Sequence, residues 1–173
     1  MSHIQLSACE SLVNTHGNLP EELAQLTLAR AYNLIMGDRP TEIPFLVWLL
    51  ENPASPLALP GKIYLQEHDY LHLLLGRGFS ASDEAYVIGF TIGNDMETKQ
   101  WHLWLYKFVS LLMYPPQFRF TLSDLREFDK GLVRGKRLPI KNLNKLDFTD
   151  YQNWQLSRLR IGLGLGRISN STH

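Results

Sequence analysis

The chain has 173 residues, of which 45% are apolar and 20% are charged, and its formal net charge is zero. This length suits one domain with a full core, and this composition excludes a mostly disordered chain. A neutral chain is also a poor general nucleic-acid binder, since that affinity comes largely from neutralising phosphates, so we expect no nucleic-acid partner.

Charged residues are distributed unevenly along the chain. Residues 1–116 contain 6 Lys/Arg and 12 Asp/Glu, whereas residues 117–173 contain 11 and 5, so an anionic partner is expected at the C-terminal third.

Cys9 is the single cysteine, which leaves no disulfide framework. The start lacks a signal or transit segment, and the longest apolar run, Phe45–Leu50, is far shorter than the roughly 20 residues of a membrane span. We therefore expect a cytoplasmic protein that does not cross the membrane.

Apolar residues at helical spacing, separated by proline and glycine, predict a series of helices. In chain order these cover residues 18–36, 43–52, 62–75, 80–93, 99–113, 121–135 and 150–164. Their ends carry recognisable cap residues, namely Asn18, Ser80 or Ser82 and Thr121 at starts, and Gly76 or Gly78 and Gly135 at ends. Strand signals are absent. The sequence predicts one all-α domain over residues 1–173, a bundle of about six to eight helices with residues 1–17 and 166–173 loosely ordered.

The helix over residues 62–75 carries polar groups on a face that should be buried. At 100° per residue, His72 lies about 40° from His68, Asp69 about 100° away, and Leu65 and Leu75 about 60° and 340° away. The two histidines and the aspartate thus share a face with leucines, which should look inward. Burying such groups without partners costs several kcal/mol, roughly 2–7 for one neutral polar group.

A bound metal ion is one explanation for this polar face. Histidines at i and i+4 on one helical face can reach one ion, and Asp69 can add an oxygen. If the next helix packs back on the first, Glu84 returns to the level of the histidines. Such ligands suit zinc, iron or manganese better than magnesium. The alternative is a structural cluster in which a buried histidine has no ligand and Asp69 pairs with Arg77.

The spacing His68-Asp69-x-x-His72, followed after eleven residues by Glu84, resembles the signature of the coenzyme Q biosynthesis protein 4 family. Further similarity is looser and spans residues 19–166. It comprises the segment ARAYNLIM, a Leu-Pro-Gly turn before the motif helix, and Trp154, Leu159 and Arg160 ahead of a glycine.

The resemblance implies an all-helical fold, peripheral membrane association, and one divalent metal, usually argued to be zinc, at His68, Asp69, His72 and Glu84. It also implies a role in ubiquinone synthesis on polyprenylated ring intermediates. That role is described both as organising the other enzymes and as replacing the ring carboxylate with a hydroxyl by oxidative decarboxylation. Without a mitochondrial targeting region, and with its unusual HDYLHLLLGRGF and ETKQWHLWLYKF segments, the chain looks like a divergent bacterial member that handles ubiquinone or a different prenyl lipid.

The helix over residues 101–113 is apolar almost all round. Core packing or a dimer interface is the first explanation, because apolar helices are usually buried. The functional alternative is an apolar wall for a prenyl chain, in which each buried CH₂ would contribute roughly 0.8 kcal/mol. The lipid-contacting residues predicted on this basis are Leu65, Leu75, Trp101, Trp104 and Phe108.

Residues 130–145 interleave basic residues with Leu, Val, Ile and Pro. A solvated basic loop is one interpretation. The other is a surface for anionic headgroups, formed by Arg134, Lys136, Arg137 and Lys141.

Three functional hypotheses follow. The first is a metal-containing protein that binds a polyprenyl lipid or quinone precursor beside other quinone-biosynthesis proteins, as a homodimer at the inner face of the membrane, with or without catalysis. The second is a non-catalytic scaffold that presents the lipid. The third is a metal-dependent phosphohydrolase of HD type, for which His16 and Asp95 are the candidate additional ligands.

Overall fold

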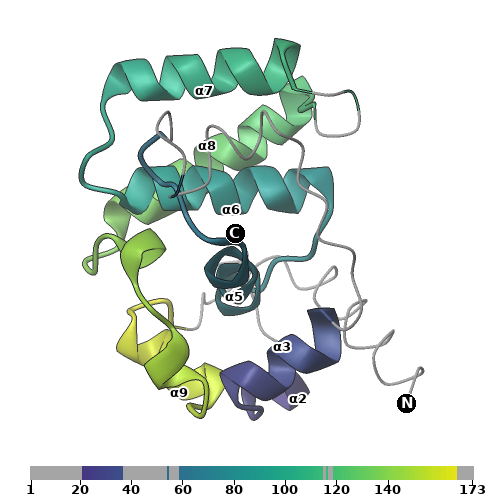
Figure 1. Ribbon diagram of the computed structural model, residues 1–173, viewed down its shortest axis with the longest axis vertical. Coiled ribbons are helices and arrows are strands. Elements are labelled where there is room, and N and C mark those ends of the chain that lie inside the picture. Colours follow the sequence, from purple (N-terminus) through teal and green to yellow (C-terminus); the bar gives the residue numbers. More distant parts are fainter. Residues whose placement is uncertain (1–20, 37–53, 55–58, 115, 117–118, 167–173) are drawn as a thin grey trace, which may run out of the picture. The chain divides into compact units, whose positions relative to one another are not determined.

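The described part of the protein is built from helices joined by loops and turns. The computed structural model describes residues 21–36, 54, 59–114, 116 and 119–166 (Figure 1). Seven α-helices and two 3-10 helices occur in these ranges, and no strand does. One isolated antiparallel bridge joins Thr27 to Gln155. The all-α class predicted from the sequence is confirmed, whereas the predicted helix over residues 43–52 and nearly all of the chain ends predicted to be loose lie outside the described residues.

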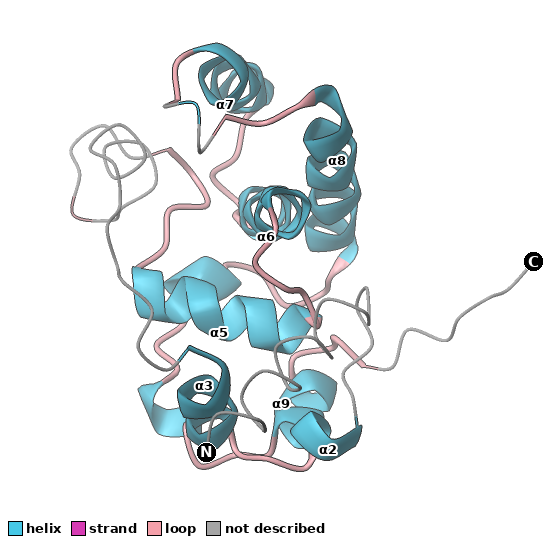
Figure 2. Cartoon of the chain, turned by 90° about the vertical axis from the view of Figure 1, so that its right-hand side faces the viewer, coloured by secondary structure: helices cyan, strands magenta, loops and turns pink. Residues whose placement is uncertain are grey.

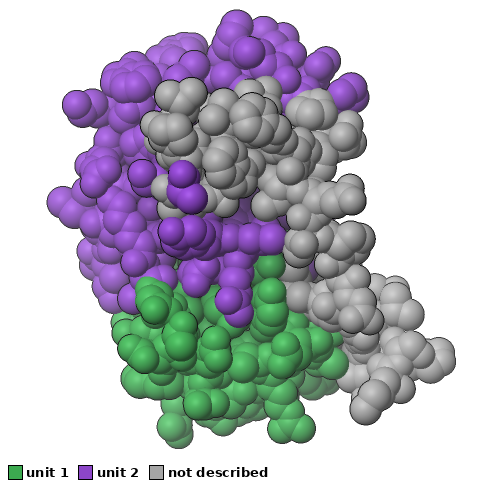
Figure 3. Space-filling view, viewed as in Figure 1, with its two compact units in different colours: residues 1–39, 69–78, 147–173 green, residues 40–68, 79–146 purple. Residues whose placement is uncertain are grey.

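The chain divides into two compact units, which are coloured separately in Figure 3. Unit 1 comprises residues 1–39, 69–78 and 147–173, and unit 2 comprises residues 40–68 and 79–146. The division falls within one continuous helix, α5 (Leu65–Leu75), so this helix contributes to both units. That the whole chain forms one domain stays a prediction.

Unit 1 contains α2 (Glu21–Ala24), α3 (Leu28–Met36), most of α5, the 3-10 helix η3 (Thr149–Tyr151) and α9 (Leu156–Gly162). The sequence predicts one helix where α2 and α3 stand, and this is wrong. The chain makes a turn and a single bridge between them, where the N–H of Leu28 donates to the carbonyl of Trp154 and the N–H of Leu156 donates to that of Leu26, both at 2.9 Å. Pairing with the segment before α9 thus replaces one helical turn.

The core of unit 1 is built around α5. The ring of Tyr70 makes edge contacts with Tyr32 and Phe148, with centroids 5.0 and 5.8 Å away. The buried guanidinium of Arg160 donates from Nη1 to the carbonyl of Leu74 at 2.5 Å, where α5 approaches its C-terminal end. A basic side chain is favourable there because the last carbonyls of a helix have no partner within it.

Unit 2 contains α6 (Ala81–Asn94), α7 (Gln100–Leu112), α8 (Leu122–Arg137) and the 3-10 helix η2 (Leu143–Lys145). Figures 1 and 2 show α6 and α7 with nearly parallel axes and opposite chain directions, with α8 crossing beside them. The predicted caps are confirmed at Ser80 and Thr121, whose side-chain oxygens accept hydrogen bonds from the N–H groups of Asp83 and Asp124.

Helices α6 and α8 approach each other at four glycines, two on each helix. A Cβ added to Gly89 would lie 2.1 Å from the carbonyl oxygen of Phe128, and one added to Gly131 would lie 2.0 Å from that of Tyr86. Gly135 makes the same kind of contact, which corrects its prediction as a helix stop: α8 continues to Arg137. Spacing glycines four apart on each helix lets the two backbones touch.

The inner face of α7 closes the core of unit 2. Leu103, Tyr106 and Val109 are buried, and the ring of Tyr106 stacks on Phe128 of α8 with centroids 5.3 Å apart. Among the described helices of both units, none is long and apolar enough to cross a membrane.

Candidate metal site

Helix α5 carries His68 and His72 one turn apart, as the sequence predicts. Gly76, with φ of +65°, follows the last residue of α5 in the left-handed conformation that commonly ends a helix. The side chain of His68 is 12% exposed, while His72 is fully buried. Both imidazoles therefore sit on the inward-looking face of the helix.

Helix α6 supplies the carboxylate. Its cap at Ser80 places Glu84 in the first turn, where the helix N-terminus favours a negative charge. Nε2 of His68 lies 3.1 Å from Oε2 of Glu84. The expected return of Glu84 to the level of the first histidine is confirmed.

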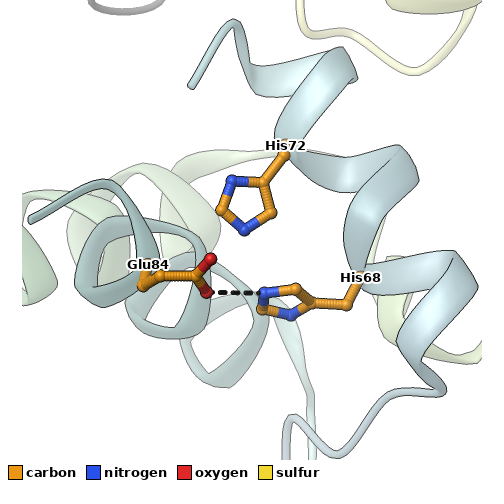
Figure 4. Close-up of side chains that lie close together, drawn as sticks. All are labelled: His68, His72 and Glu84. Atoms are coloured by element: carbon orange, nitrogen blue, oxygen red, sulfur yellow. Dashed lines mark hydrogen bonds and ion pairs between the residues drawn. The ribbon is translucent and has the colours of Figure 1, made fainter. Parts of the chain in front are cut away.

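The three side chains converge, as Figure 4 shows. One ligand atom from each of His68, His72 and Glu84 lies within 4.8 Å of the other two, so this group could hold a metal ion. In a tetrahedral zinc site with bonds of about 2.1 Å, two ligand atoms lie about 3.4 Å apart. A pair separated by as much as 4.8 Å would therefore have to close by roughly 1.4 Å around a bound ion.

A backbone carbonyl orients His72. Its Nδ1 lies 2.6 Å from the carbonyl oxygen of Gly78, which can only accept, so Nδ1 carries the proton and donates it. In the neutral ring, Nε2 then keeps its lone pair. Metal-binding histidines typically donate such a hydrogen bond from the ring nitrogen that does not bind the ion. This bond fixes the tautomer and the orientation of the ring.

Asp69, the fourth predicted ligand, is buried at 7% exposure but does not belong to this group. It lies one residue past His68, about 100° around the helix. The structure thus brings together three of the four predicted metal ligands.

A small hollow adjoins His68 within unit 2. Its free volume is about 10 Å³, room for about one water molecule. The lining is mostly apolar, with Lys62 and Thr91 as polar members, and comprises Leu59, Pro60, Gly61, Ile63, Ile88, Ile92 and Tyr106 besides His68. Ile88 and Tyr106 lie beside His68 in this lining although nothing local in the sequence links them to it.

The predicted lipid-contacting residues do not share one environment. Leu75 is fully buried in unit 1, whereas Trp101, Trp104 and Phe108 are 57%, 70% and 55% exposed on α7, and Leu65 is partly exposed. Core packing is therefore wrong for these three aromatic residues, because α7 turns its other face to the core. A prenyl tunnel formed by these residues stays a prediction.

The predicted headgroup residues fall into two pairs. Arg134 donates to the hydroxyl of Tyr86 at 3.1 Å, and Nζ of Lys141 donates to the carbonyls of Gly135 and Lys136 near the end of α8. These two side chains have structural contacts. Lys136 and Arg137 are exposed near the C-terminal end of α8.

Asp95, a candidate ligand of the HD-type hypothesis, has a structural role instead. Its carboxylate is buried and accepts hydrogen bonds from four donors, namely the N–H groups of Gly61 and Glu97 and the side chains of Asn144 and Lys145. It ties the end of α6 to the turn at Gly61 and to η2. His16, the other candidate, lies outside the described residues.

No protein-family model, no curated protein and no solved structure matches the chain. The resemblance to the coenzyme Q biosynthesis protein 4 family therefore rests on the sequence motif and stays a prediction.

Proposed function

We propose that the protein holds one divalent metal ion through His68, His72 and Glu84 and uses it to bind the polar head of a polyprenyl lipid or prenylated quinone precursor. The observation that carries this proposal is the convergence of the three ligand atoms within 4.8 Å. The sequence motif supplies the assignment to quinone biosynthesis.

Two imidazoles and a carboxylate are a donor set suited to zinc, iron or manganese, and zinc is the metal that the resemblance favours. Magnesium is less suited, because it prefers oxygen ligands. Three protein ligands leave coordination positions open, so a bound ion supplies Lewis-acid attraction for the oxygens of a carboxylate or phosphate.

The protein's own groups prepare this site. The Gly78 carbonyl fixes the ring of His72. The contact between Nε2 of His68 and Oε2 of Glu84 keeps these two ligands adjacent, and bonds to a bound ion would replace it. The apolar lining of the hollow beside His68 limits water there, which strengthens electrostatic attraction at the site.

The identity of the metal separates two forms of this function. Zinc has no redox chemistry, so zinc, or magnesium, would favour a protein that carries and presents the lipid to partner enzymes. Iron or manganese would favour an enzyme of oxidative decarboxylation. The HD-type phosphohydrolase is disfavoured because the carboxylate of Asp95 is already occupied by four donors.

The remaining parts of the proposal concern partners and location. We propose contact with other quinone-biosynthesis proteins, a homodimeric state, and a cytoplasmic location beside the membrane. The quinone-biosynthesis partners and the position beside the membrane follow from the resemblance, and the homodimer follows from the apolar helix over residues 101–113.

The test is elemental analysis with native mass spectrometry of protein purified without added metal. We expect one divalent ion per chain and a co-purified prenyl lipid. His72→Ala should lose the ion because it removes a buried ligand, while His102→Ala, which removes a histidine from α7, should retain it. Retention of one ion per chain by His72→Ala would refute the site.

A further inference from the structure

The N-terminal end of α7 is capped differently from those of α6 and α8. Ser80 and Thr121 cap α6 and α8 with side-chain oxygens, which accept hydrogen bonds from backbone N–H groups. The residue at the same position of α7 is Lys99, whose side chain has donors and no acceptor. An acceptor at this end of α7 therefore has to come from another residue.

His102 supplies this acceptor. The backbone N–H of Lys99 donates to Nδ1 of His102 at 3.0 Å, and the backbone N–H of His102 donates to the carbonyl of Lys99 at 3.0 Å. The imidazole takes the place of the Glu or Gln of a capping box, which reaches back from the third helical residue to the N–H group before the helix. We call these two hydrogen bonds the His102 cap.

The His102 cap requires a neutral imidazole. An N–H group can only donate, so Nδ1 of His102 accepts with its lone pair and the ring carries its proton on Nε2. This tautomer is the opposite of that of His72, whose Nδ1 donates to a carbonyl. In a protonated imidazole both nitrogens are donors. Protonation of His102 therefore breaks its hydrogen bond with Lys99.

The surroundings of His102 oppose its protonation. The residue is buried in the first turn of α7, and a helix N-terminus disfavours a positive charge. Burial lowers the pKa of His102 below its ordinary value of 6.5, and the positive charge of Lys99 lowers this pKa further. Asp95 at the end of α6 acts in the opposite direction, but its carboxylate pairs with Lys145 of η2 at 3.3 Å. Within the described residues, Lys99 and Asp95 are the two charged groups that act on this ring.

The other neighbours of this part of α7 do not replace the cap. Lys107 and Asp129, which join α7 to α8, pair with each other at 2.6 Å. The ring of Trp101 lies beside the imidazole, with centroids 3.8 Å apart, and its π-system would attract an imidazolium. That attraction cannot restore the hydrogen bond of Lys99, because the cation has no acceptor at Nδ1.

These observations make the end of α7 sensitive to pH in the range where histidine titrates. We infer that the His102 cap is an acid-sensitive switch: the neutral imidazole closes the first turn of α7, and protonation opens it. Because His102 takes up a proton less readily in the closed turn, the closed turn loses stability as the pH falls below about 6.5. The switch involves none of the three metal ligands. It acts on the helix whose Tyr106, one turn further on, lines the hollow beside His68.

The test is hydrogen exchange of backbone amides, measured by mass spectrometry on the full chain at about pH 7.5 and about pH 5.5 and corrected for the intrinsic exchange rate. We expect the protection of residues 99–105 in the wild type to fall severalfold in acid. The upper limit is about tenfold, because a histidine with the ordinary pKa of about 6.5 is protonated about ten to one at pH 5.5.

The first turn of α8 is the internal control. Burial alone would raise the pKa of Asp124 in its cap, but hydrogen bonds from Thr121 and Ser82 outweigh this effect and lower the pKa below its ordinary value of 3.8. Asp124 therefore stays ionised at both pH values, and the protection of this turn should not change.

Two variants assign the response to His102. His102→Gln keeps an acceptor that does not titrate, so the protection of α7 should be equal at both pH values. His102→Ala removes the acceptor, so the first turn of α7 should exchange rapidly at both. In the wild type at neutral pH, nitrogen NMR of the ring should find Nδ1 without a proton.

Three results would overturn the inference. The first is equal protection of α7 in the wild type at both pH values, and the second is a proton on Nδ1 of His102 at neutral pH. The third is an acid response that persists in His102→Gln, because a different group, such as a metal ligand, would then be the one that titrates.

Discussion

Helices α7 and α8 belong to the same unit but pack in opposite ways. Helix α8 is rich in charged residues, yet its backbone touches that of α6 at Gly131 and Gly135. Helix α7 is mostly apolar, yet Trp104 and Phe108 remain exposed. The more apolar helix is therefore not the one with the closer contacts.

This difference shows that hydrophobicity and close packing are separate properties. Two helices approach most closely where small residues on both remove the side chains that would keep the backbones apart. A high apolar content shows only that removing the helix surface from water is favourable in free energy. Burial in the protein interior, in lipid or against a partner can each provide this gain.

The largest expected effect is at the contact of α6 with α8. Gly131→Ala places a Cβ 2.0 Å from the carbonyl oxygen of Tyr86, which forces the helices apart. We expect the free energy of unfolding, measured by chemical denaturation, to fall by at least about 5 kcal/mol. Gly162→Ala on α9 is the matched control, because a Cβ there would meet nothing within 4 Å. Equal free energies of unfolding for the two variants would show that the glycines do not determine how closely α6 and α8 approach each other.

The two faces of α7 give the next largest difference. Tyr106→Ala removes a fully buried ring stacked on Phe128 and should cost about 3–5 kcal/mol of unfolding free energy. Trp104→Ala removes a larger side chain that is 70% exposed and should change stability by no more than about 0.5 kcal/mol. Denaturation curves of the two variants compare the two faces of α7 directly. A loss of several kcal/mol of unfolding free energy in Trp104→Ala, about as large as that of Tyr106→Ala, would mean that the exposed face of α7 is packed.

A smaller effect is expected at Asp95, which fixes the end of α6. Burial alone would raise the pKa of this carboxyl group, but hydrogen bonds outweigh that effect and lower the pKa below its ordinary value of 3.8. The donors are the N–H groups of Glu97 and Gly61 and the side chains of Asn144 and Lys145. Because the pKa is lower in the folded state, ionised Asp95 stabilises the protein above about pH 4, and this contribution is lost as the pH falls through the folded-state value.

We expect Asp95→Ala to lower the free energy of unfolding at neutral pH by about 1–3 kcal/mol, because it leaves buried donors without an acceptor. The difference from the wild type should shrink when denaturation is repeated in increasingly acidic buffer. Asp150→Ala, at an exposed position, should behave like the wild type at neutral pH. A pH-independent difference at Asp95 would indicate that its charge contributes nothing.

Much of the candidate site could be predicted from the sequence, because it depends on local spacing. The i, i+4 positions of His68 and His72 on one helix follow from helical geometry, and the start of α6 at Ser80 follows from its capping signal. The role of the Gly78 carbonyl could not be predicted, because every residue has a carbonyl and only the folded turn directs this one at His72.

The sequence by itself determined the helical class, most helix positions and the pairing of a histidine face with Glu84, since these depend on periodicity and caps. Tertiary structure decided the rest. It broke the predicted first helix at Thr27, where pairing with Gln155 supplies hydrogen bonds from a distant segment. It also decided which face of α7 is buried, because a helix that is apolar all round carries no local signal for the side that will meet the core.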